Sequence, residues 1–533
     1  MRNEFIPTLM CDFYKISHRI QYPQGTTLVY SNLTARNDKY NQCAKSKFYD
    51  KKFTWFGLRY FLINLQEMFT KNFFEKDLQD CLNEYSRVIK YCLNDNNPDC
   101  THIKALHELG YLPLEIKALP ELSRVNFGIP VLTIKNTLPE FFWLTNFIET
   151  WLSCDLWQLS NSASIAYEYK NICTEYANKT CNNDEHVKFQ CHDFSFRGMS
   201  SHQSAMMSGM GHLTSFNGTD TIPAILGMEK YYNKNIENEL VGCSIPASEH
   251  SVMASGGKDT ELETYRRFIT ELYPNGLVSI VSDTWDFWAV LTDILPQLKD
   301  EIMARDGKVV IRPDSGDPVD IICGLNTYDD NFDAYCAYEK SIFINKEDHK
   351  IYLINWIGVD QHIDNHGSEY LSDEMDYLVN EYKEFNVYAI KGAIEILWDI
   401  FGGTINEKGY KVLDSHIGLI YGDSITIERC QEILDRLEQK GFASSNVVFG
   451  VGSYTYQYNT RDSMGWAVKA TYCEINGKGI NIFKEPKTDS GKKSAKGLLR
   501  VEKSSGEYVL LQEQITDDGG ELKTVFIDGK LSK

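Results

Sequence analysis

Seven apolar runs, each stopping on a polar residue or a glycine, divide the chain between about residue 187 and residue 453. The runs end at His192-Asp193, Thr219-Asp220, Ser244-Ile245-Pro246, Ser282-Asp283, Arg312-Pro313-Asp314, Gly422-Asp423 and Gly450-Val451-Gly452. Most successive endings are roughly 25 to 40 residues apart, the length of one strand plus one returning helix. The repeat predicts the α/β class, with an irregular β/α barrel of about seven parallel strands. Polar residues at the ends of such strands converge on one face, where barrel enzymes carry their chemistry.

Composition narrows the class of protein further. The chain has 533 residues, more than one hydrophobic core usually holds. Its net charge of −20 argues against a nucleic-acid partner, because phosphate backbones require clustered Lys and Arg. No run of about 18 apolar residues occurs, so we expect no membrane span. The 14 cysteines form no CxxC pair, which favours reduced thiols and a cytoplasmic location.

Four parts are expected along the chain. Residues 1–180 mix short strands and helices, and residues 181–323 with 392–460 carry the barrel repeats. Between them, residues 324–391 form an acidic insertion, because the spacing from one strand end to the next there is some 70 residues longer than a repeat needs. Residues 461–533 return to antiparallel strands, which we expect to pack with the N-terminal part in one largely antiparallel β domain.

A hairpin is predicted in the last part. The strands Val468–Ile475 and Ile480–Phe483 flank the turn sequence Asn476-Gly477-Lys478-Gly479. Asn-Gly between alternating apolar residues is a strong short-range hairpin signal.

The segment from Val309 to Pro318 brings Arg312, Asp314 and a serine to the end of one buried strand. Arginine binds an anion in a fixed fork, and a carboxylate accepts vicinal hydroxyls or holds Mg²⁺ through water. The pair therefore suits a phosphorylated ribose. The alternative is an internal Arg–Asp ion pair that closes the end of the barrel.

Glycines end the last two strands. Gly422-Asp423-Ser424 and Gly450-Val451-Gly452-Ser453 suit a phosphate site built from backbone N–H groups, which often follows the seventh and eighth strands of such barrels. Turns without a ligand are the alternative.

Basic residues gather downstream in this acidic chain. Arg461, Lys469 and Lys484 precede four further lysines at positions 487, 492, 493 and 496. They could neutralise pyrophosphate or nucleotide phosphates, or form a solvated lysine-rich hairpin.

Three more side chains follow predicted strand ends. His250 lies in Ser248-Glu249-His250-Ser251, where it could transfer protons, accept a phosphoryl group, or be structural. Asp220 precedes Thr221-Ile222-Pro223, so it either caps a helix or accepts a substrate amide N–H. Phe194 could stack on a flat ring.

These residues belong to ordered motifs that span nearly the whole chain. The motifs are Asp12-Phe13-Tyr14-Lys15, His192-Asp193-Phe194-Ser195-Phe196-Arg197-Gly198, Gly218-Thr219-Asp220-Thr221, Pro246-Ala247-Ser248-Glu249-His250-Ser251, Val281-Ser282-Asp283, Ile311-Arg312-Pro313-Asp314-Ser315-Gly316, Gly422-Asp423, Thr460-Arg461-Asp462 and Gly479-Ile480-Asn481-Ile482-Phe483-Lys484. In them the chain resembles the nicotinamide phosphoribosyltransferases, a group within the type II phosphoribosyltransferase family.

The resemblance implies a reaction and its partners. Nicotinamide would receive the 5-phosphoribosyl group of phosphoribosyl pyrophosphate, with Mg²⁺ as cofactor and ATP as co-substrate. It also implies a homodimer with shared active sites, in which Tyr14 of one subunit and Phe194 of the other enclose the nicotinamide ring. Asp220 would accept the carboxamide N–H and disfavour nicotinate, whose carboxylate it would repel.

The resemblance also implies roles for the remaining candidates. His250 would be the phosphorylated histidine that couples ATP hydrolysis to transfer, near Asp283, with Arg312 and Asp314 as further catalytic residues. Mg²⁺ would bind through pyrophosphate, with Asp283 or Asp314 contacting it through water. The other candidate substrate-binding residues are Arg197, Ser244, Ser279, Gly422, Asp423, Gly452, Ser453, Arg36, Arg461, Lys469 and Lys484.

Two other functions remain open from sequence. The first is a nicotinate phosphoribosyltransferase, which Asp220 argues against. The second is a catalytically silent barrel that binds a partner through the acidic insertion, which the presence of His250, Arg312 and Asp314 argues against.

Overall fold

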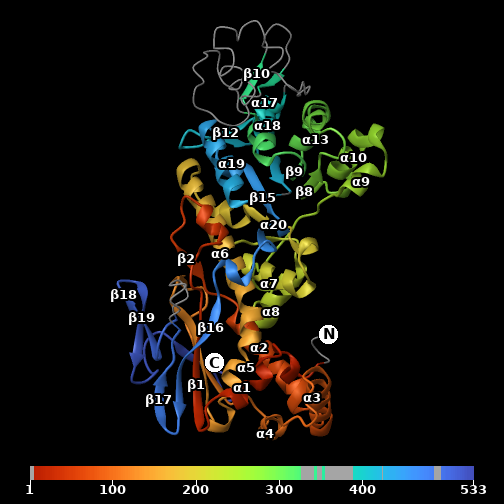
Figure 1. Ribbon diagram of the computed structural model, residues 1–533. Coiled ribbons are helices and arrows are strands. Elements are labelled where there is room, and N and C mark those ends of the chain that lie inside the picture. Colours follow the sequence, from red (N-terminus) through yellow and green to blue (C-terminus); the bar gives the residue numbers. More distant parts are fainter. Residues whose placement is uncertain are drawn as a thin grey trace, which may run out of the picture. The chain divides into compact units, whose positions relative to one another are not determined.

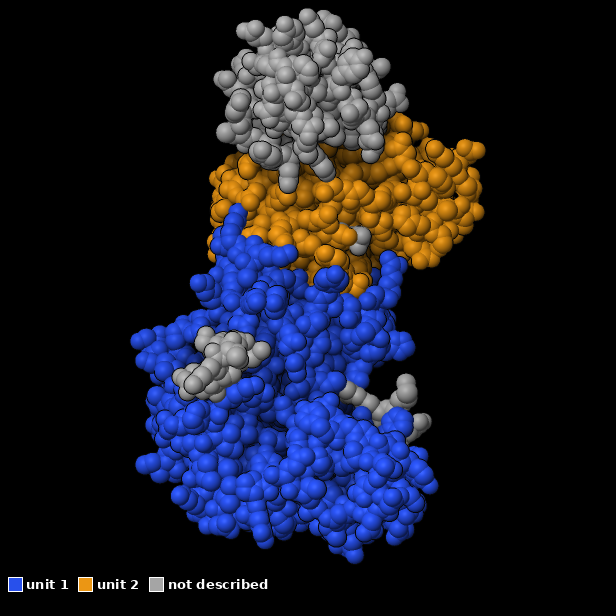
Figure 2. Space-filling model, in the orientation of Figure 1, with its two compact units in different colours: residues 1–168, 195–242, 456–533 blue, residues 169–194, 243–455 orange. Residues whose placement is uncertain are grey.

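The computed structural model describes residues 5–325, 341–344, 351–354, 388–422, 424–484 and 494–532, with only the backbone at 341–344 and 351–354. The chain divides into two compact units (Figure 2). Unit 1 comprises residues 1–168, 195–242 and 456–533, and unit 2 comprises residues 169–194 and 243–455. Each unit is therefore assembled from segments far apart in sequence.

A sheet in unit 1 joins the two ends of the chain (Figure 1). Its order is β17-β16-β1-β5-β3-β20-β21, and every neighbouring pair is antiparallel. Its strands are β1 (Thr26–Thr34), β3 (Leu114–Ala118), β5 (Pro130–Asn136), β16 (Ala467–Ile475), β17 (Lys478–Asn481), β20 (Lys523–Ile527) and β21 (Lys530–Leu531). This confirms the predicted antiparallel β part built from both chain ends.

Smaller ladders and helices complete unit 1. β2 (Lys52–Thr54) pairs with β4 (Arg124–Asn126), and β18 (Leu498–Ser504) pairs with β19 (Glu507–Gln514). The helices are α1 (Lys15–Gln21), α2 (Leu58–Phe69), α3 (Leu78–Cys92), α4 (Thr101–Leu109), α5 (Leu144–Phe147), α7 (His202–His212) and α8 (Ile222–Tyr232), with the short strand β7 (Gly218–Thr219) between the last two. The long helix α6 (Glu149–Thr180) starts in unit 1 and ends in unit 2. Among the helices that the structure describes, none is both long and apolar enough to cross a membrane.

Parallel strands form the centre of unit 2. They are β6 (Cys191–Asp193), β15 (Val447–Val451), β14 (Ile417–Tyr421), β9 (Asp306–Arg312) and β8 (Asn275–Val281), side by side in that order. The four pairings between them are all parallel. The side chains of Val278, Val309 and Phe449 are fully buried, as expected for parallel strands with covered faces.

Helices follow most of these strands. They are α9 (His250–Ala254), α10 (Glu261–Arg267), α11 (Phe287–Ala289), α12 (Leu295–Gln297), α13 (Lys299–Met303), α14 (Pro318–Cys323), α17 (Tyr388–Lys391), α18 (Ala393–Phe401), α19 (Ile427–Gln439) and α20 (Ser453–Tyr456). In α19, Ile427, Cys430 and Leu434 are buried on one face, as their spacing predicts. A short ladder of β12 (Gly403–Ile405) with β13 (Lys411–Leu413) precedes β14.

Six of the seven predicted strand endings follow a strand, namely β6, β7, β8, β9, β14 and β15. The exception is the run that ends at Pro246. Near it the described residues form single bridges rather than a strand, one of them parallel, between Ala247 and Ser279. Proline lacks the N–H that a ladder requires, which shortens the pairing. The α/β class with a parallel sheet is confirmed, whereas a closed seven-stranded barrel is not.

The predicted insertion, residues 324–391, lies mostly outside the described residues. Within it the structure describes α17 and the backbone of an antiparallel pair, β10 (Ser341–Ile344) with β11 (Ile351–Ile354). The two ends of the insertion lie together, because the N–H of Leu325 donates to the carbonyl of Ala389 at 3.0 Å. A Cβ added at Gly324 would lie 2.1 Å from the carbonyl oxygen of Ile390, so only glycine permits this approach.

Candidate active site

Candidate residues in unit 2 follow one another along the carboxyl edge of the parallel sheet. Phe194 comes directly after β6, Gly452 directly after β15 and Gly422 directly after β14. Arg312 is the last residue of β9, and Asp283 lies two residues beyond β8. Because neighbouring strands are parallel, their carboxyl ends share one edge, and this edge is where ligands of open α/β sheets bind.

Hydrogen bonds join neighbouring segments at this edge. The N–H of Phe194 donates to the carbonyl of Val451 at 2.9 Å, and the N–H of Gly422 donates to the carbonyl of Pro313 at 3.1 Å. The N–H of Ser282 donates to the carbonyl of Arg312 at 2.9 Å. The backbone that carries the candidate side chains is therefore held in place before any substrate binds.

His250 lies at the start of α9 between a hydroxyl and a carboxylate. Its Nδ1 is 3.0 Å from Oγ1 of Thr284, and its Nε2 is 3.2 Å from Oδ1 of Asp314. An ionised carboxylate only accepts hydrogen bonds, so a neutral His250 donates its Nε2–H to Asp314. Nδ1 then carries the lone pair and faces the Thr284 hydroxyl.

Asp283 accepts two hydrogen bonds from the segment that carries Asp314. Its Oδ2 accepts the N–H of Asp314 at 3.1 Å and also the hydroxyl of Ser315. Its other oxygen, Oδ1, is buried, accepts no hydrogen bond from the residues that the structure describes, and lies 4.0 Å from Nε2 of His250. A buried carboxylate oxygen without a donor is costly unless a ligand or cation completes it.

These side chains fit a divalent cation. Ligand atoms of His250, Asp283 and Asp314 all lie within 4.8 Å of one another. Carboxylate oxygens are the protein ligands that Mg²⁺ prefers, usually with several waters and substrate phosphates. The unsatisfied Oδ1 of Asp283 is the specific feature of this structure that such an ion, or its water, would satisfy.

Arg312 and its neighbours form the adjacent part of the edge. The Arg312 guanidinium donates to the carbonyl of Ser248 at 2.6 Å, and the Ser248 hydroxyl accepts the N–H of Val281 at 2.9 Å. Ser279, in β8, is 4% exposed, and its hydroxyl has no hydrogen-bond partner in the described structure. Ser244 is exposed, ahead of the bridge at Ala247.

Glycines allow close approach at two strand ends. A Cβ added at Gly422 would lie 3.0 Å from Cβ of Asp314. At Gly450 an added Cβ would lie 2.6 Å from the carbonyl oxygen of Tyr421 and 2.8 Å from Cδ2 of Phe194. Gly450 is therefore the residue that lets Phe194 pack against the end of β15. Gly452 and Ser453 lie at the start of α20, and Asp423 lies outside the described residues.

Several candidate cations of unit 1 interact with one another. Burial lowers the pKa of Lys469; Glu149 opposes this, while Arg36, Lys15 and Lys484 lower it further. Arg36 is held through its Nε, which donates to the carbonyl of Gly465 at 2.9 Å. Repulsion of Lys469 by three neighbouring cations, opposed by one carboxylate, is a setting in which an anionic ligand binds favourably.

Two further candidates of unit 1 are exposed. The Tyr14 side chain is 59% exposed at the start of α1, with its ring 5.1 Å from that of His18. Arg461 donates to its neighbour Asp462 at 3.2 Å. Both are available for contact with a ligand or another subunit.

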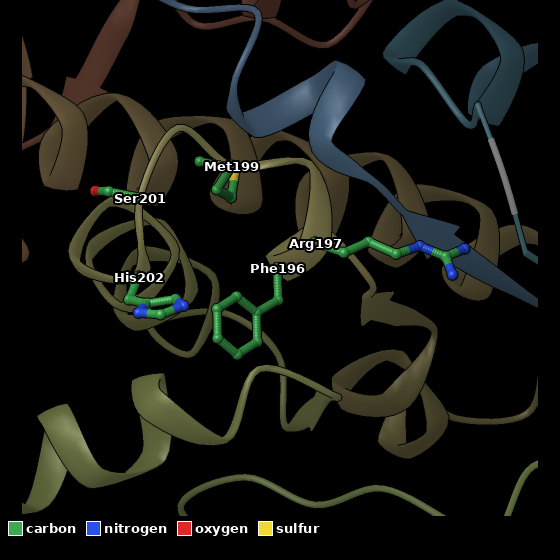
Figure 3. A pocket seen from close by; sticks show the side chains of 5 residues that line it. All are labelled: Phe196, Arg197, Met199, Ser201 and His202. Atoms are coloured by element: carbon green, nitrogen blue, oxygen red, sulfur yellow. The ribbon is translucent and has the colours of Figure 1, made fainter.

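Arg197 and Asp220 also belong to unit 1. Arg197 lines a pocket of about 390 Å³ with Phe196 and His202. The Phe196 and His202 rings lie edge to face, with centroids 5.9 Å apart, while the Arg197 side chain extends in another direction (Figure 3). Asp220 is exposed, and Thr221 rather than Asp220 occupies the N-cap position of α8, without a side-chain capping hydrogen bond.

Thr284 is a candidate site residue that sequence reasoning missed, whereas Ser315 and Gly450 were named only as members of motifs, without the contacts that the structure shows. Thr284 and Ser315 each adjoin a candidate aspartate, so their position after a strand end was the available signal. Gly450 was read with Gly452 as one phosphate-loop motif. Its close contact with Phe194 depends on strands far apart in sequence and has no local signal.

Comparison with known proteins gives consistent matches. A family model described as the nicotinate phosphoribosyltransferase (NAPRTase) family matches residues 189–529. Nicotinamide phosphoribosyltransferase of Acinetobacter baylyi is 47% identical, covering 98% of this chain and 94% of that protein. The enzyme of the same name from Mycoplasma pneumoniae is 35% identical, covering 92% of this chain and 94% of that protein.

A solved structure shares the fold. The crystal structure of human nicotinic acid phosphoribosyltransferase is 12% identical and has a TM-score of 0.50, covering 98% of this chain and 90% of that chain. At this identity the similarity concerns the fold alone.

Proposed function

Since this chain belongs to the nicotinate phosphoribosyltransferase (NAPRTase) family, we propose that it transfers the 5-phosphoribosyl group of phosphoribosyl pyrophosphate to nicotinamide. The products are nicotinamide mononucleotide and pyrophosphate, so the enzyme is a pentosyltransferase of NAD salvage. The observation that carries the proposal is the cluster at the carboxyl edge, where His250, Asp283 and Asp314 meet beside Arg312 and Gly422.

The chemistry needs charge stabilisation rather than a protein nucleophile. The pyridine nitrogen of nicotinamide forms a bond to C1 of the ribose as the bond from C1 to pyrophosphate breaks. Positive charge develops on the ribose, and negative charge develops on the leaving group. Carboxylates such as Asp314 and a guanidinium such as Arg312 stabilise these opposite charges, and preorganised groups of this kind are usually the largest catalytic contribution.

In this proposal, different residues of unit 2 bind different parts of the substrates. The backbone N–H of Gly452 and the Ser453 hydroxyl bind phosphate as donors, while Gly422, whose own N–H donates to Pro313, lets the phosphate approach the backbone closely. Phe194 stacks on the pyridine ring. When bound, Mg²⁺ neutralises charge on the pyrophosphate, and Asp283 and Asp314 are the residues that would hold it directly or through water.

We also propose that His250 is phosphorylated by ATP. Nδ1 would attack the γ-phosphorus, forming an N–P bond as the bond to ADP breaks. The hydrogen bond from Nε2 to Asp314 leaves Nδ1 as the nucleophilic nitrogen and stabilises the charged ring of the product. The Thr284 hydroxyl then orients the nucleophile.

The family resemblance is the basis for the oligomeric state and the cellular location that we propose. We propose a homodimer in which the exposed Tyr14 of one subunit contributes to the nicotinamide site of its partner. The cations Arg36, Lys469, Lys484 and Arg461 are proposed to hold phosphate groups. The described cysteines are all free thiols, which supports a cytoplasmic location.

A product assay with two pyridines tests the function. The chain is incubated with phosphoribosyl pyrophosphate, Mg²⁺ and ATP, and with either nicotinamide or nicotinate, and the mononucleotides are quantified. We expect product from nicotinamide. Product from nicotinate alone would instead identify a nicotinate enzyme, and no product from either ring would leave only the binding-protein alternative.

Asp220 is the residue proposed to set this choice. A carboxylate at this position accepts an N–H from the carboxamide of nicotinamide. It repels the carboxylate of nicotinate, about 4 Å away, by roughly 4 kcal/mol at an effective dielectric constant near 20. The isosteric Asp220→Asn variant should therefore lose much of its preference for nicotinamide. An unchanged ratio of kcat/KM values would remove Asp220 from this role while leaving the transferase assignment intact.

A further inference from the structure

A pocket of unit 2 lies at the amino edge of the parallel sheet, opposite the candidate active site. Its volume is about 440 Å³. Its lining comes from the segments that lead into the parallel strands: residues 181–186 ahead of β6, residues 404–407 with Val412 ahead of β14, and Ser445 ahead of β15. Because these strands are parallel, the segments before them share one edge. The pocket contains none of the residues assigned to phosphoribosyl transfer.

A cysteine and a histidine lie together in this pocket. Sγ of Cys181 is 4.0 Å from Nε2 of His186 and 3.3 Å from the hydroxyl of Ser444. The Cys181 residue is 5% exposed, yet it lines the pocket. A thiol beside an imidazole and a hydroxyl donor is the arrangement that favours the thiolate, the reactive form of cysteine.

The surrounding backbone holds Cys181 in place. The hydroxyl of Thr180 accepts the N–H of Ser444 at 2.9 Å, and the carbonyl of Thr180 accepts an amide N–H from Asn406 at 2.7 Å. These contacts join the end of α6 to two neighbouring loops. The thiol therefore faces the pocket from a fixed position rather than from a free loop.

The balance of interactions favours ionisation. Burial raises the pKa of the Cys181 thiol, but hydrogen bonds from His186 and Ser444, with the charge of His186, outweigh it and lower the pKa to about 6. The end of α6 carries a partial negative charge that opposes the thiolate. An imidazolium at His186, 4.0 Å from Sγ, would oppose that half charge with a full positive charge.

The pocket also selects among oxidants. Glu407 is part of its lining, so an anionic reagent such as a glutathione disulfide is disfavoured. A small neutral hydroperoxide meets no such repulsion and fits the available volume.

We propose that Cys181 is a peroxide-sensitive thiol that hydrogen peroxide oxidises to a sulfenic acid within this pocket. The thiolate sulfur attacks one peroxide oxygen, an S–O bond forms, and the O–O bond breaks. The sulfur loses two electrons and the peroxide gains them. The departing hydroxide takes a proton from the His186 imidazolium and leaves as water, so His186 assists both the nucleophile and the leaving group.

The test measures oxidation of individual cysteines in the intact protein. Wild type and the His186→Gln variant are treated with hydrogen peroxide and dimedone, which traps sulfenic acids, between pH 5 and pH 9. Peptide mass spectrometry then gives the rate at Cys181. The buried Cys43 of unit 1 is the folding control, because its labelling reports unfolding.

The expected result is a change in the pH profile. In wild type the Cys181 rate should level off above about pH 7, whereas in His186→Gln it should keep rising past pH 8, as for an ordinary thiol with a pKa near 8.5. At pH 6 the thiolate fraction favours wild type by more than 100-fold. The lower nucleophilicity of a more acidic thiol reduces the expected advantage to about tenfold.

Three results would overturn the proposal: a Cys181 profile like that of an ordinary thiol, an equal rate in wild type and His186→Gln, or labelling of Cys181 only in step with Cys43. A Ser444→Ala variant separates the two donors. It should slow Cys181 oxidation less than His186→Gln does, because it removes a hydrogen bond but leaves the positive charge.

Discussion

Replacing Asp314 by Asn isolates the carboxylate that faces His250. Asn has the same shape, and its side-chain oxygen can still accept a hydrogen bond, so the change removes chiefly the negative charge at 3.2 Å from Nε2. In the proposed phosphorylation of His250, the product is a charged ring that this carboxylate would stabilise. The variant should therefore lose phosphohistidine formation while keeping its fold.

The size of the effect follows from distance and exposure. Two unit charges 3.2 Å apart interact by about 5 kcal/mol at an effective dielectric constant of 20. The His250 and Asp314 side chains are 48% and 28% exposed, so solvent screens much of this. A hydrogen bond to a charged group contributes about 1.5–3 kcal/mol, which corresponds to a loss of roughly 10- to 100-fold in rate.

The assay is single-turnover transfer of the γ-phosphoryl group of ATP to the protein at saturating Mg²⁺. The matched control is Asp317→Asn, which removes a carboxylate three residues away. Asp317 caps α14 by accepting the N–H of Val319, and Asn is an equally good N-cap, so this control should change neither the stability nor the rate of phosphorylation appreciably. Asp314→Asn protein that is phosphorylated within twofold of the wild-type rate would refute the role given to this carboxylate.

Three further predictions concern stability, packing and the insertion. Burial raises the pKa of the Asp517 carboxyl, but the ion pairs with Lys135 and Lys117 outweigh burial and lower it. Asp517 therefore stabilises the fold above about pH 4, and this stabilisation is lost as the pH falls through the lowered pKa. Asp517→Asn should therefore cost roughly 3 kcal/mol in urea unfolding at pH 7 and progressively less below pH 4; a cost that is independent of pH, or equal to that of the exposed neighbour Asp518→Asn, would contradict the ion-pair account. Gly450→Ala should displace Phe194 and raise the KM for nicotinamide several-fold. Gly418→Ala should not, because its Cβ would lie 3.1 Å from the flexible chain of Lys308 and at an ordinary 3.8 Å from Val310; equal kinetics in both variants would rule out the packing role. Replacing residues 326–387 with a short Gly-Ser linker should leave the melting temperature within a few degrees of the parent, because Leu325 and Ala389 are already hydrogen-bonded; loss of folding would show that the insertion supports unit 2.

Strand ends were predictable because they depend on local sequence. A buried apolar run followed by Asp, Gly or Arg identifies both the strand and the edge on which its last residue lies, and this holds for β8, β9 and β14. The run that ends at Pro246 fails because proline lacks the N–H that continuous pairing needs. Which neighbours a strand has is not local information, so the contact between Gly450 and Phe194 could not be predicted.

In the C-terminal hairpin, too, local sequence predicts the location of the turn but not the contact between its strands. Its location is correct, but the turn comprises only Asn476 and Gly477, with φ of 52° and 72°, and β17 begins at Lys478. Gly479 belongs to the strand rather than to the turn. A Cβ there would lie 2.2 Å from the hydroxyl of Tyr472 on the neighbouring strand, so any larger residue would require the Tyr472 ring to move.

Hydrogen–deuterium exchange with and without phosphoribosyl pyrophosphate and Mg²⁺ examines where the donor binds. We predict slower exchange in the segments that follow the parallel strands, residues 282–286, 312–316 and 449–453, and unchanged exchange at residues 404–412 on the opposite edge. Protection confined to the opposite edge, or no protection in unit 2 at a saturating donor concentration, would contradict the assignment of the carboxyl edge as the active site.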